Sequence, residues 1–159
     1  MNNTLLLFFV CLLVALQSNA QTRKKAELEF IKRLNTIANN SVAPSPREFE
    51  GKYSIDSAYA ISKTGLLSTT FRYTTDTSFF RMRLTVPISK IRDIFYDYYL
   101  VMVCDPHAVT IYRSATNRKA VKESGNDYLF HIGVPVSAGE VQQEKLQQAL
   151  VALQHYYGK

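Results

Sequence analysis

"KYSIDSAYAISKTGLLSTTFRYTTDTSFFRMRLTV", residues 52–86, predicts three antiparallel strands that follow one another along the chain. Its first part alternates apolar residues with polar or small ones, as a half-buried strand does. The next residues, Lys63 to Gly65, suit a three-residue hairpin loop, because glycine accepts the left-handed conformation that such a loop requires. An antiparallel meander therefore forms the middle of the predicted fold.

The two loops of this meander also predict which residues lie opposite each other. Closing the first loop on Ser62 and Leu66 gives four pairs: Ile61 with Leu67, Tyr59 with Thr69, Ser57 with Phe71 and Ile55 with Tyr73. A looser four-residue loop centred on Asp76 and Thr77 gives four more: Tyr73 with Phe80, Phe71 with Met82, Thr69 with Leu84 and Leu67 with Val86. In both registers the apolar residues fall largely on one face, which supports the pairing independently.

Three arginines share the opposite face of the predicted sheet. Arg72 lies across from Arg81, and Arg83 lies across from Thr70. Like charges directly opposed destabilise a sheet by up to about 1 kcal/mol, and a bound anion would relieve that repulsion. Because a guanidinium group donates paired hydrogen bonds to carboxylate or phosphate, we predict a ligand-binding site at Arg72, Arg81 and Arg83. The alternative is a solvated face, on which Asp56 lies next to Arg72 and the charges form a row that contributes little energetically.

The N-terminal stretch MNNTLLLFFVCLLVALQSNAQ is typical of a secretory signal peptide. Its apolar run from Leu5 to Leu16 is shorter than the roughly 20 residues that a membrane-spanning helix needs. Two small residues, Ser18 and Ala20, precede a cleavage site before Gln21. We therefore expect export to the periplasm or the outside after cleavage between Ala20 and Gln21, and an uncleaved anchor is the alternative.

The predicted organisation has four parts. These are a signal peptide at residues 1–20, an N-terminal helix at 21–39, a linker at 40–47, and a sheet domain with a C-terminal helix at 48–159. The N-terminal helix has an apolar stripe made of Leu28, Ile31, Leu34, Ile37 and Ala38. Cleavage leaves Cys104 as the only cysteine, so the mature chain forms no intramolecular disulfide, and we expect no membrane span in it.

Three more strands are predicted beyond residue 86. YYLVMVC, residues 98–104, is apolar without alternation, which predicts a strand covered on both faces. The other two strands are VTIYR, residues 109–113, and YLFHIGV, residues 128–134. Between the strands, we interpret ISKIRDI, residues 88–94, as a helical turn or an irregular edge, and SATNRKAVKESGND, residues 114–127, as a polar loop.

The C-terminal helix is the clearest element in the sequence. Ser137 and Glu140 form a capping box, and Val136 and Val141 occupy the two positions of a hydrophobic staple. Its apolar stripe comprises Val141, Leu146, Ala149, Leu150, Leu153 and Tyr157. The order of elements predicts an α+β domain with an N-terminal helix, a curved antiparallel sheet of about six strands and a long amphipathic C-terminal helix.

A run of meander strands followed by one long amphipathic helix resembles the pleckstrin-homology-like (PH-like) half-barrel. The segment VPISKIRDIFYDYYLVMVCD, residues 86–105, is similar to the part of such domains in which spaced isoleucines lead into a hydrophobic strand. The combination is similar to small exported bacterial proteins of unassigned activity. The resemblance covers residues 50–157, rests on topology and hydrophobic pattern, and implies no site residue.

Composition and motifs narrow the chemistry. The chain has 159 residues, of which 47% are hydrophobic, and this suits one packed domain. Its net charge of +6 favours anionic partners, but the lack of a block of Lys and Arg argues against nucleic acid. His131 and His155 lack the spacing of metal ligands, and no Gly-rich phosphate loop is present. We therefore expect neither a metal nor a cofactor.

The favoured interpretation is an exported, non-enzymatic binding module whose basic sheet face contacts an unknown protein, a lipid or an acidic glycan. One alternative is a small thiol-dependent hydrolase that uses Cys104 as nucleophile and His107 as base. The other alternative is a structural component of an envelope assembly.

Overall fold

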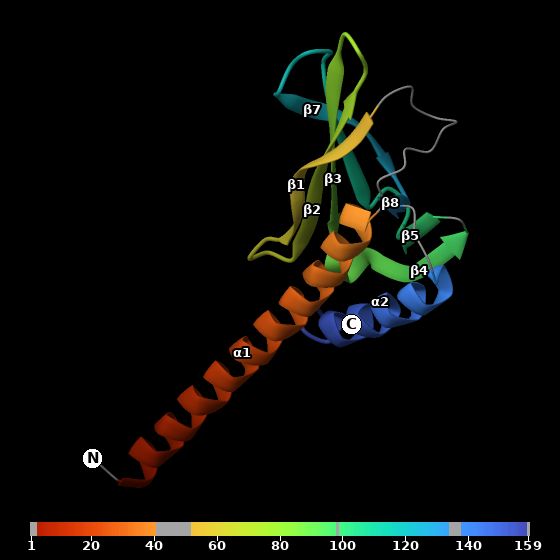
Figure 1. Ribbon diagram of the computed structural model, residues 1–159. Helices are drawn as coiled ribbons and strands as arrows, with labels where there is room; N and C mark the ends of the chain where they lie inside the picture. Colours follow the sequence, from red (N-terminus) through yellow and green to blue (C-terminus); the bar gives the residue numbers. More distant parts are fainter. Residues whose placement is uncertain (1–2, 41–51, 98, 134–137, 159) are drawn as a thin grey trace.

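The computed structural model describes the backbone of residues 3–40, 52–97, 99–133 and 138–158, and the side chains of residues 21–40, 54–97, 99–132 and 138–158. The elements in chain order are α1 (Asn3–Asn40), β1 (Lys52–Ile61), β2 (Leu66–Thr74), β3 (Phe79–Pro87), η1 (Ile88–Lys90), β4 (Ile91–Asp97), β5 (Tyr99–Cys104), β6 (Val109–Ser114), β7 (Val121–Asp127), β8 (Leu129–Gly133) and α2 (Gly139–Gln154). Figure 1 shows α1 and α2 side by side at one end of the strands.

The strands form two antiparallel sheets and not the single curved sheet that the sequence predicted. Sheet A has five strands in the order β1-β2-β3-β6-β7, and sheet B has three strands in the order β4-β5-β8. The α+β class and both terminal helices are confirmed. The expectation of about six strands was wrong, because the described residues form eight, and these do not form a closed barrel.

The two strands that the sequence analysis missed are β4 and β7. The predicted turn or irregular edge is the short helix η1 followed by β4. The predicted polar loop contains β7, whose five central residues are all exposed. An edge strand in water lacks the apolar alternation by which strands are recognised, so hydrophobic pattern alone cannot find it.

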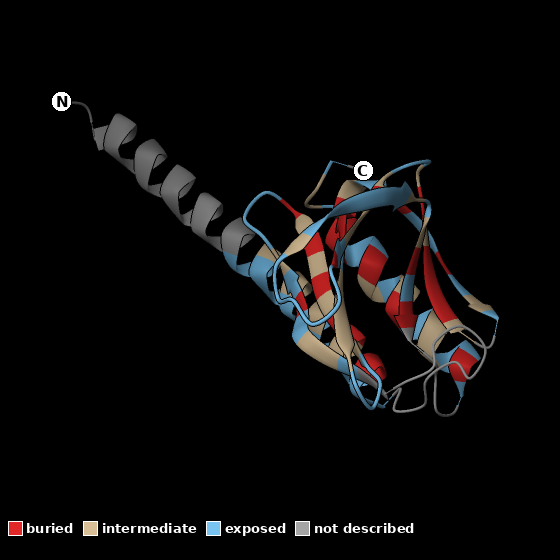
Figure 2. Ribbon diagram, turned by 90° about the horizontal axis from the view of Figure 1, so that it is seen from above, coloured by how far each residue is buried: buried red, intermediate tan, exposed pale blue. Residues whose placement is uncertain are grey.

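The core lies between the inner faces of the two sheets and the two helices, where the buried segments in Figure 2 are turned toward one another. The second half of α1 belongs to it, since Phe30 and Leu34 are fully buried. The predicted stripe of α1 was wrong at Leu28, which is 58% exposed. Phe30, which the predicted stripe omitted, is buried, and its large side chain removes more apolar area from water than Leu28 would. No helix in the described part of the chain is long and apolar enough to span a membrane.

The predicted β2–β3 register is confirmed at all four pairs. The connection between these strands has four residues, Thr75 to Ser78, and the Thr75 N–H donates to the Ser78 carbonyl at 2.8 Å. The first hairpin is confirmed near its turn, where Ile61 lies opposite Leu67 and Gly65 has a φ of 79°.

Further from the turn, the predicted β1–β2 register was wrong. β1 shifts register twice, between Ser57 and Ala60 and again between Ile55 and Ser57. As a result, Ser57 pairs with Thr70, Ile55 pairs with Phe71, and Tyr53 pairs with Tyr73. The first irregularity is supported from α1, because Asn35 Oδ1 accepts a hydrogen bond from the Tyr59 N–H at 2.8 Å. A side chain on a distant helix therefore satisfies a strand amide, which a two-strand pattern cannot reveal.

The helix α2 begins at Gly139, after Ala138 in the left-handed conformation. Ser137 and Val136 lie outside the described residues, so the capping box and the staple stay predictions. In the predicted stripe, Leu146, Leu150 and Leu153 are buried and Ala149 and Tyr157 are partly buried, but Val141 in the first turn is 47% exposed. At this turn the Tyr96 ring packs against Gly139, where a Cβ atom would lie 2.3 Å from the ring.

Glutamine side chains of α2 cover the free edge of β4. Gln143 Nε2 donates to the Ile94 carbonyl at 2.8 Å, and the Ile94 N–H donates to Gln147 Oε1 at 2.9 Å. Gln154 Nε2 donates to the Ile91 carbonyl at 2.6 Å. These amides satisfy backbone groups that would otherwise attract another strand. The β4 edge of sheet B is thereby covered by α2.

Candidate acidic-ligand site on sheet A

The predicted arginine face is the outer face of sheet A, on the side away from the core. Along β2 and β3, inner positions such as Phe71 and Leu84 are buried, and Arg72, Arg81 and Arg83 occupy the alternate positions. Arg72 lies opposite Arg81, and Arg83 lies opposite Thr70, as predicted. The structure therefore brings the three predicted residues onto one face of two neighbouring strands.

Asp56 lies between two of these arginines. Its Oδ1 is 3.3 Å from Arg72 Nε, and its Oδ2 accepts a hydrogen bond from Arg81 Nε. The strand position opposite Arg72 belongs to Ser54, so Asp56 reaches the arginines from the irregular part of β1. The Asp56 side chain is only 15% exposed. One carboxylate thus offsets the repulsion between two opposed guanidinium groups.

Further contacts fix these two guanidinium groups. Arg81 Nη1 donates to the Lys119 carbonyl at 3.2 Å, and the backbone N–H of Arg81 donates to Ser114 Oγ at 2.8 Å. The Arg72 guanidinium lies over the Phe79 ring, 4.7 Å from its centroid. A ligand that binds to groups already held in place costs less side-chain entropy.

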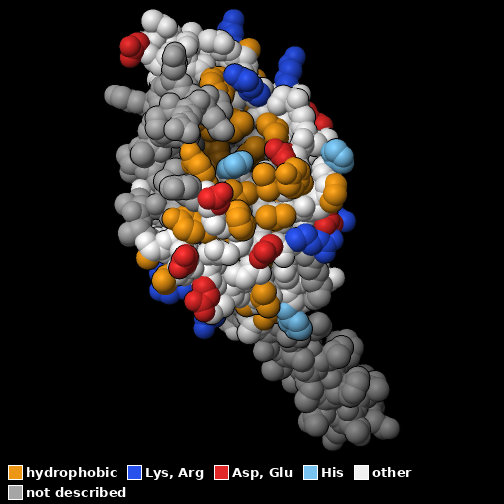
Figure 3. All heavy atoms as spheres, turned by 90° about the vertical axis from the view of Figure 1, so that its right-hand side faces the viewer, with side chains coloured by type: hydrophobic (Ala, Val, Ile, Leu, Met, Phe, Trp, Pro, Cys, Tyr) orange, Lys and Arg blue, Asp and Glu red, His pale blue; other side chains and the backbone are white. Residues whose placement is uncertain are grey.

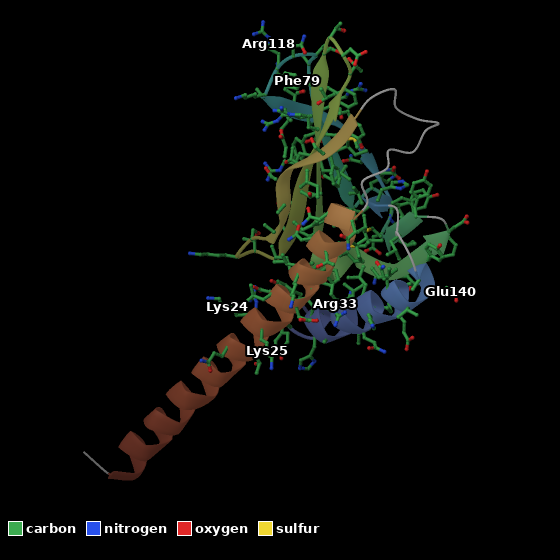
Figure 4. The ribbon with its side chains drawn as sticks, in the orientation of Figure 1. Lys24, Lys25, Arg33, Phe79, Arg118 and Glu140 are labelled. Carbon is green, nitrogen blue, oxygen red and sulfur yellow. The ribbon has the colours of Figure 1, made fainter. Side chains whose placement is uncertain are left out.

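The loop between β6 and β7, residues 115–120, extends the same face. The Phe79 N–H donates to Asn117 Oδ1 at 2.9 Å, and the Asn117 N–H donates to the Phe79 carbonyl at 2.8 Å. These bonds attach the loop to the first residue of β3, and Figure 4 shows Phe79 and Arg118 at the same end of the molecule. Sequence reasoning missed the contribution of Arg118 and Lys119. The only local signal was Asn117, a residue type that tolerates the positive φ of 60° it adopts.

Arg83 is the least constrained of the three predicted residues. It is exposed, and its guanidinium carbon lies 6.0 Å from the centroid of the Tyr112 ring. Among the residues whose side chains are described, no carboxylate forms an ion pair with Arg83. Its charge and its hydrogen-bond donors are therefore available to a ligand.

The positive charge of the protein is concentrated on sheet A. Residues 52–87 and 109–127, which form this sheet and its loops, contain nine basic and four acidic residues and so account for five of the six net charges. Residues 88–108, which include β4 and β5, contain two basic and three acidic residues. An asymmetric charge distribution of this kind directs acidic partners to the positive side.

The two residues of the predicted thiol site lie in different environments. Cys104 is buried, and its thiol donates to the Met102 carbonyl at 3.6 Å. His107 is exposed in the turn after β5, with a φ of 60°. A thiol nucleophile must be accessible to substrate, so the burial of Cys104 argues against the hydrolase, which stays an untested prediction.

Within the described residues, no group of three or more His, Cys, Asp or Glu side chains is placed to hold a metal ion. His131 packs against Tyr99, with ring centroids 6.4 Å apart, and His155 packs against Tyr156. No protein-family model, no curated protein and no solved structure matches this chain. The function is therefore argued from the arginine face itself.

Proposed function

We propose that this protein is an exported, non-enzymatic binding module whose outer face of sheet A binds an acidic partner. One observation carries the proposal: Arg72 and Arg81 share the single carboxylate of Asp56, and Arg83 next to them has no ion pair with any described side chain. Export rests on the predicted signal peptide, which ends at Ala20.

The basic residues of the predicted site are all arginines, and this indicates the chemistry of the partner. A guanidinium group is planar and carries five N–H donors, which match the paired oxygens of carboxylate, sulfate and phosphate. Asp56 engages both arginines through their Nε atoms. Arg72 Nε is buried and has no hydrogen-bond partner among the described residues, but the Arg72 side chain is 32% exposed, so a ligand oxygen can accept from its terminal nitrogens. An acidic protein surface, an acidic glycan and an anionic lipid headgroup all present this chemistry.

We also propose that the fold is a PH-like half-barrel. The long amphipathic helix that follows the strands supports it, although the described strands form two sheets without a closed barrel. Nothing in the proposal depends on this resemblance, because the site is argued from the arginines alone.

Thermal unfolding of the chain isolated after export tests the proposal. The ligands are polyglutamate, dextran sulfate and vesicles that contain phosphatidylglycerol, with neutral dextran as a control. A ligand that binds the native state, at about 100 times its dissociation constant, raises the free energy of unfolding by about 2.7 kcal/mol. We expect at least one acidic ligand to raise the melting temperature, and the ligand that does so identifies the class of partner.

A matched pair of variants locates the binding. Arg83→Ser with Arg118→Ser removes two exposed charges from the face, and Lys25→Ser with Lys145→Ser removes two exposed charges from the helices. We expect the shift to be lost in the first variant and kept in the second. Equal shifts in both variants, or no shift in the parent protein, would contradict the proposal.

A further inference from the structure

The outer face of sheet B differs from an ordinary solvated sheet face. Cross-strand pairs place Asp93 beside Val103, Phe95 beside Val101, and Asp97 beside Tyr99. On the next strand, His131 lies beside Val101. We call the residues Asp93, Phe95, Asp97, Tyr99, Val103 and His131 the aromatic-acidic face. Val101 at the centre of this face is buried, with 8% of its surface exposed, whereas the residues named here around it are exposed or partly exposed.

Apolar side chains on this face are open to solvent. Phe95 is 51% exposed, and Tyr99 and Val103 are partly exposed. Figure 3, which views the side of the molecule where sheet B lies, shows hydrophobic side chains gathered at the centre with acidic side chains among them. Contiguous apolar surface with a polar rim is typical of a protein-protein interface. Aromatic residues are also enriched in such interfaces.

The charge on this face is negative and is not neutralised within the described residues. Asp93 and Asp97 are both exposed, and neither forms an ion pair with a described side chain. The two nearby cations, Lys90 and Arg92, are both paired with Asp105. The hydrogen bond from Arg92 lowers the pKa of Asp105, which keeps that pair ionised. The aromatic-acidic face therefore favours a partner with positive charge.

We propose that the partner of this face is the basic outer face of sheet A on a second copy of the chain. The proposal rests on the proposed function, because it names an acidic partner for the same arginines. Arg83 and Arg118 supply exposed guanidinium groups for Asp93 and Asp97. Sheet faces pack about 10 Å apart, and opposed charges fix their relative position.

Arginine also matches the aromatic side chains of this face. Within the chain, Arg72 lies over the Phe79 ring at 4.7 Å, and Arg113 lies over the Phe80 ring at 4.3 Å. Arginine on sheet A thus already stacks on aromatic rings, and Phe95 presents a further exposed ring to the partner.

The contact joins two different faces, so it is heterologous. Each copy keeps one free face of each kind, and association continues to a ring or to an open filament. Such growth would make the protein a structural component of an assembly.

Two variants, each with one face blocked, test the proposal by sedimentation of the chain isolated after export. Asp93→Lys with Asp97→Lys blocks the aromatic-acidic face, and Arg83→Ser with Arg118→Ser blocks the basic face without creating a new acidic face. All four residues are exposed, and far-ultraviolet circular dichroism checks that both variants fold. If one does not, Asp93→Asn with Asp97→Asn or Arg83→Gln with Arg118→Gln replaces it.

We expect the wild type to gain mass with concentration in low salt and to dissociate in high salt. Each blocked variant alone stays monomeric, and an equimolar mixture forms a one-to-one dimer because each partner keeps one working face. A wild type that is monomeric at all concentrations, or a mixture that does not dimerise, overturns the proposal. If the wild type still binds polyglutamate or dextran sulfate, only the self-association fails. If it binds neither and stays monomeric, the proposed function fails with it.

Discussion

Sheet A and sheet B each bury one face in the same core, and they differ in what they present to solvent. The outer positions of β2 and β3 hold Thr70, Arg72, Arg81 and Arg83, whereas those of β4 and β5 hold aromatic and aliphatic side chains between two aspartates. Alternation along a strand determines which residues face outward. The chemistry of those residues then determines the partner that we propose for each outer face: acidic groups for sheet A, and an apolar surface with positive charge for sheet B.

The largest expected effect is a difference in stability between substitutions on the two faces of β4. Ile94 is fully buried, and its neighbour Phe95 is 51% exposed. Ile94→Ala removes buried volume and should lower the free energy of unfolding by about 2–5 kcal/mol. Phe95→Ala should change it by less than about 1 kcal/mol, because its ring is half in water. Urea unfolding of both variants measures this, and equal losses would show that the outer face is packed in the monomer.

The second prediction compares two glycines, one near each sheet. A Cβ atom at Gly139 would lie 2.3 Å from the Tyr96 ring of β4, whereas no atom lies within 4 Å of a Cβ at Gly125 in β7. Gly139→Ala should cost about 1–3 kcal/mol through overpacking, and Gly125→Ala should be nearly neutral. Melting temperatures test both. A neutral Gly139→Ala would contradict the close packing of α2 on sheet B.

The third prediction concerns the charge balance of sheet A. Asp56→Asn removes the carboxylate shared by Arg72 and Arg81 and should cost about 1–2 kcal/mol. The same change removes the negative charge beside both guanidinium groups, so binding of polyglutamate should become tighter. Asp76→Asn in the exposed β2–β3 loop is the matched control and should leave stability unchanged. Unfolding curves and titration calorimetry measure the two effects, and an unchanged affinity would exclude these arginines from the site.

The smallest predicted effect lies where sheet A meets the helices. The Tyr157 hydroxyl donates to Glu27 Oε1 at 2.6 Å and accepts from Arg23 Nη2 at 2.9 Å. Burial, together with the hydrogen bond to Glu27, raises the pKa of Tyr157 above its usual value of about 10. Tyr157→Phe should cost about 1 kcal/mol at neutral pH.

The pH dependence of this loss follows from the raised pKa. A group whose pKa is higher in the folded state contributes stability that is complete below its unfolded pKa and is lost as pH rises through its folded pKa. The difference between the wild type and Tyr157→Phe should therefore shrink above about pH 10. Urea unfolding at neutral pH and at alkaline pH measures it, with Tyr128→Phe, whose side chain is 54% exposed, as the control. A difference that stays constant would contradict the hydrogen-bonded arrangement.

Sequence patterns within a few residues predicted the β2–β3 hairpin correctly. The four-residue loop and the alternating apolar residues specified the β2–β3 register, which placed Arg72 opposite Arg81. The β1 irregularities were hidden because Asn35, on a distant helix, satisfies the backbone of Tyr59. β7 was hidden because an exposed edge strand carries no apolar pattern.

The residues of the candidate site were also predicted only in part. The arginines were found from strand alternation, and Asp56 was expected near Arg72, although it arrives through an irregular segment and not through the predicted pairing. The loop that carries Arg118 and Lys119 was missed, because its bonds to Phe79 join residues far apart in the chain. The surplus apolar surface of sheet B was also missed, because apolarity alone does not reveal whether a strand is covered.

The arginine Nε–H signals in nuclear magnetic resonance spectra give the most direct test of the central claim, that sheet A binds acidic groups through its outer face. During titration with hexaglutamate, we predict the largest shifts at Arg83 and Arg118 and smaller shifts at Arg72 and Arg81. Arg33 and Arg92, which are already paired with Glu29 and Asp105, should shift least. Shifts of equal size at all six arginines, or none at Arg83, would contradict the claim and return this face to an ordinary solvated surface.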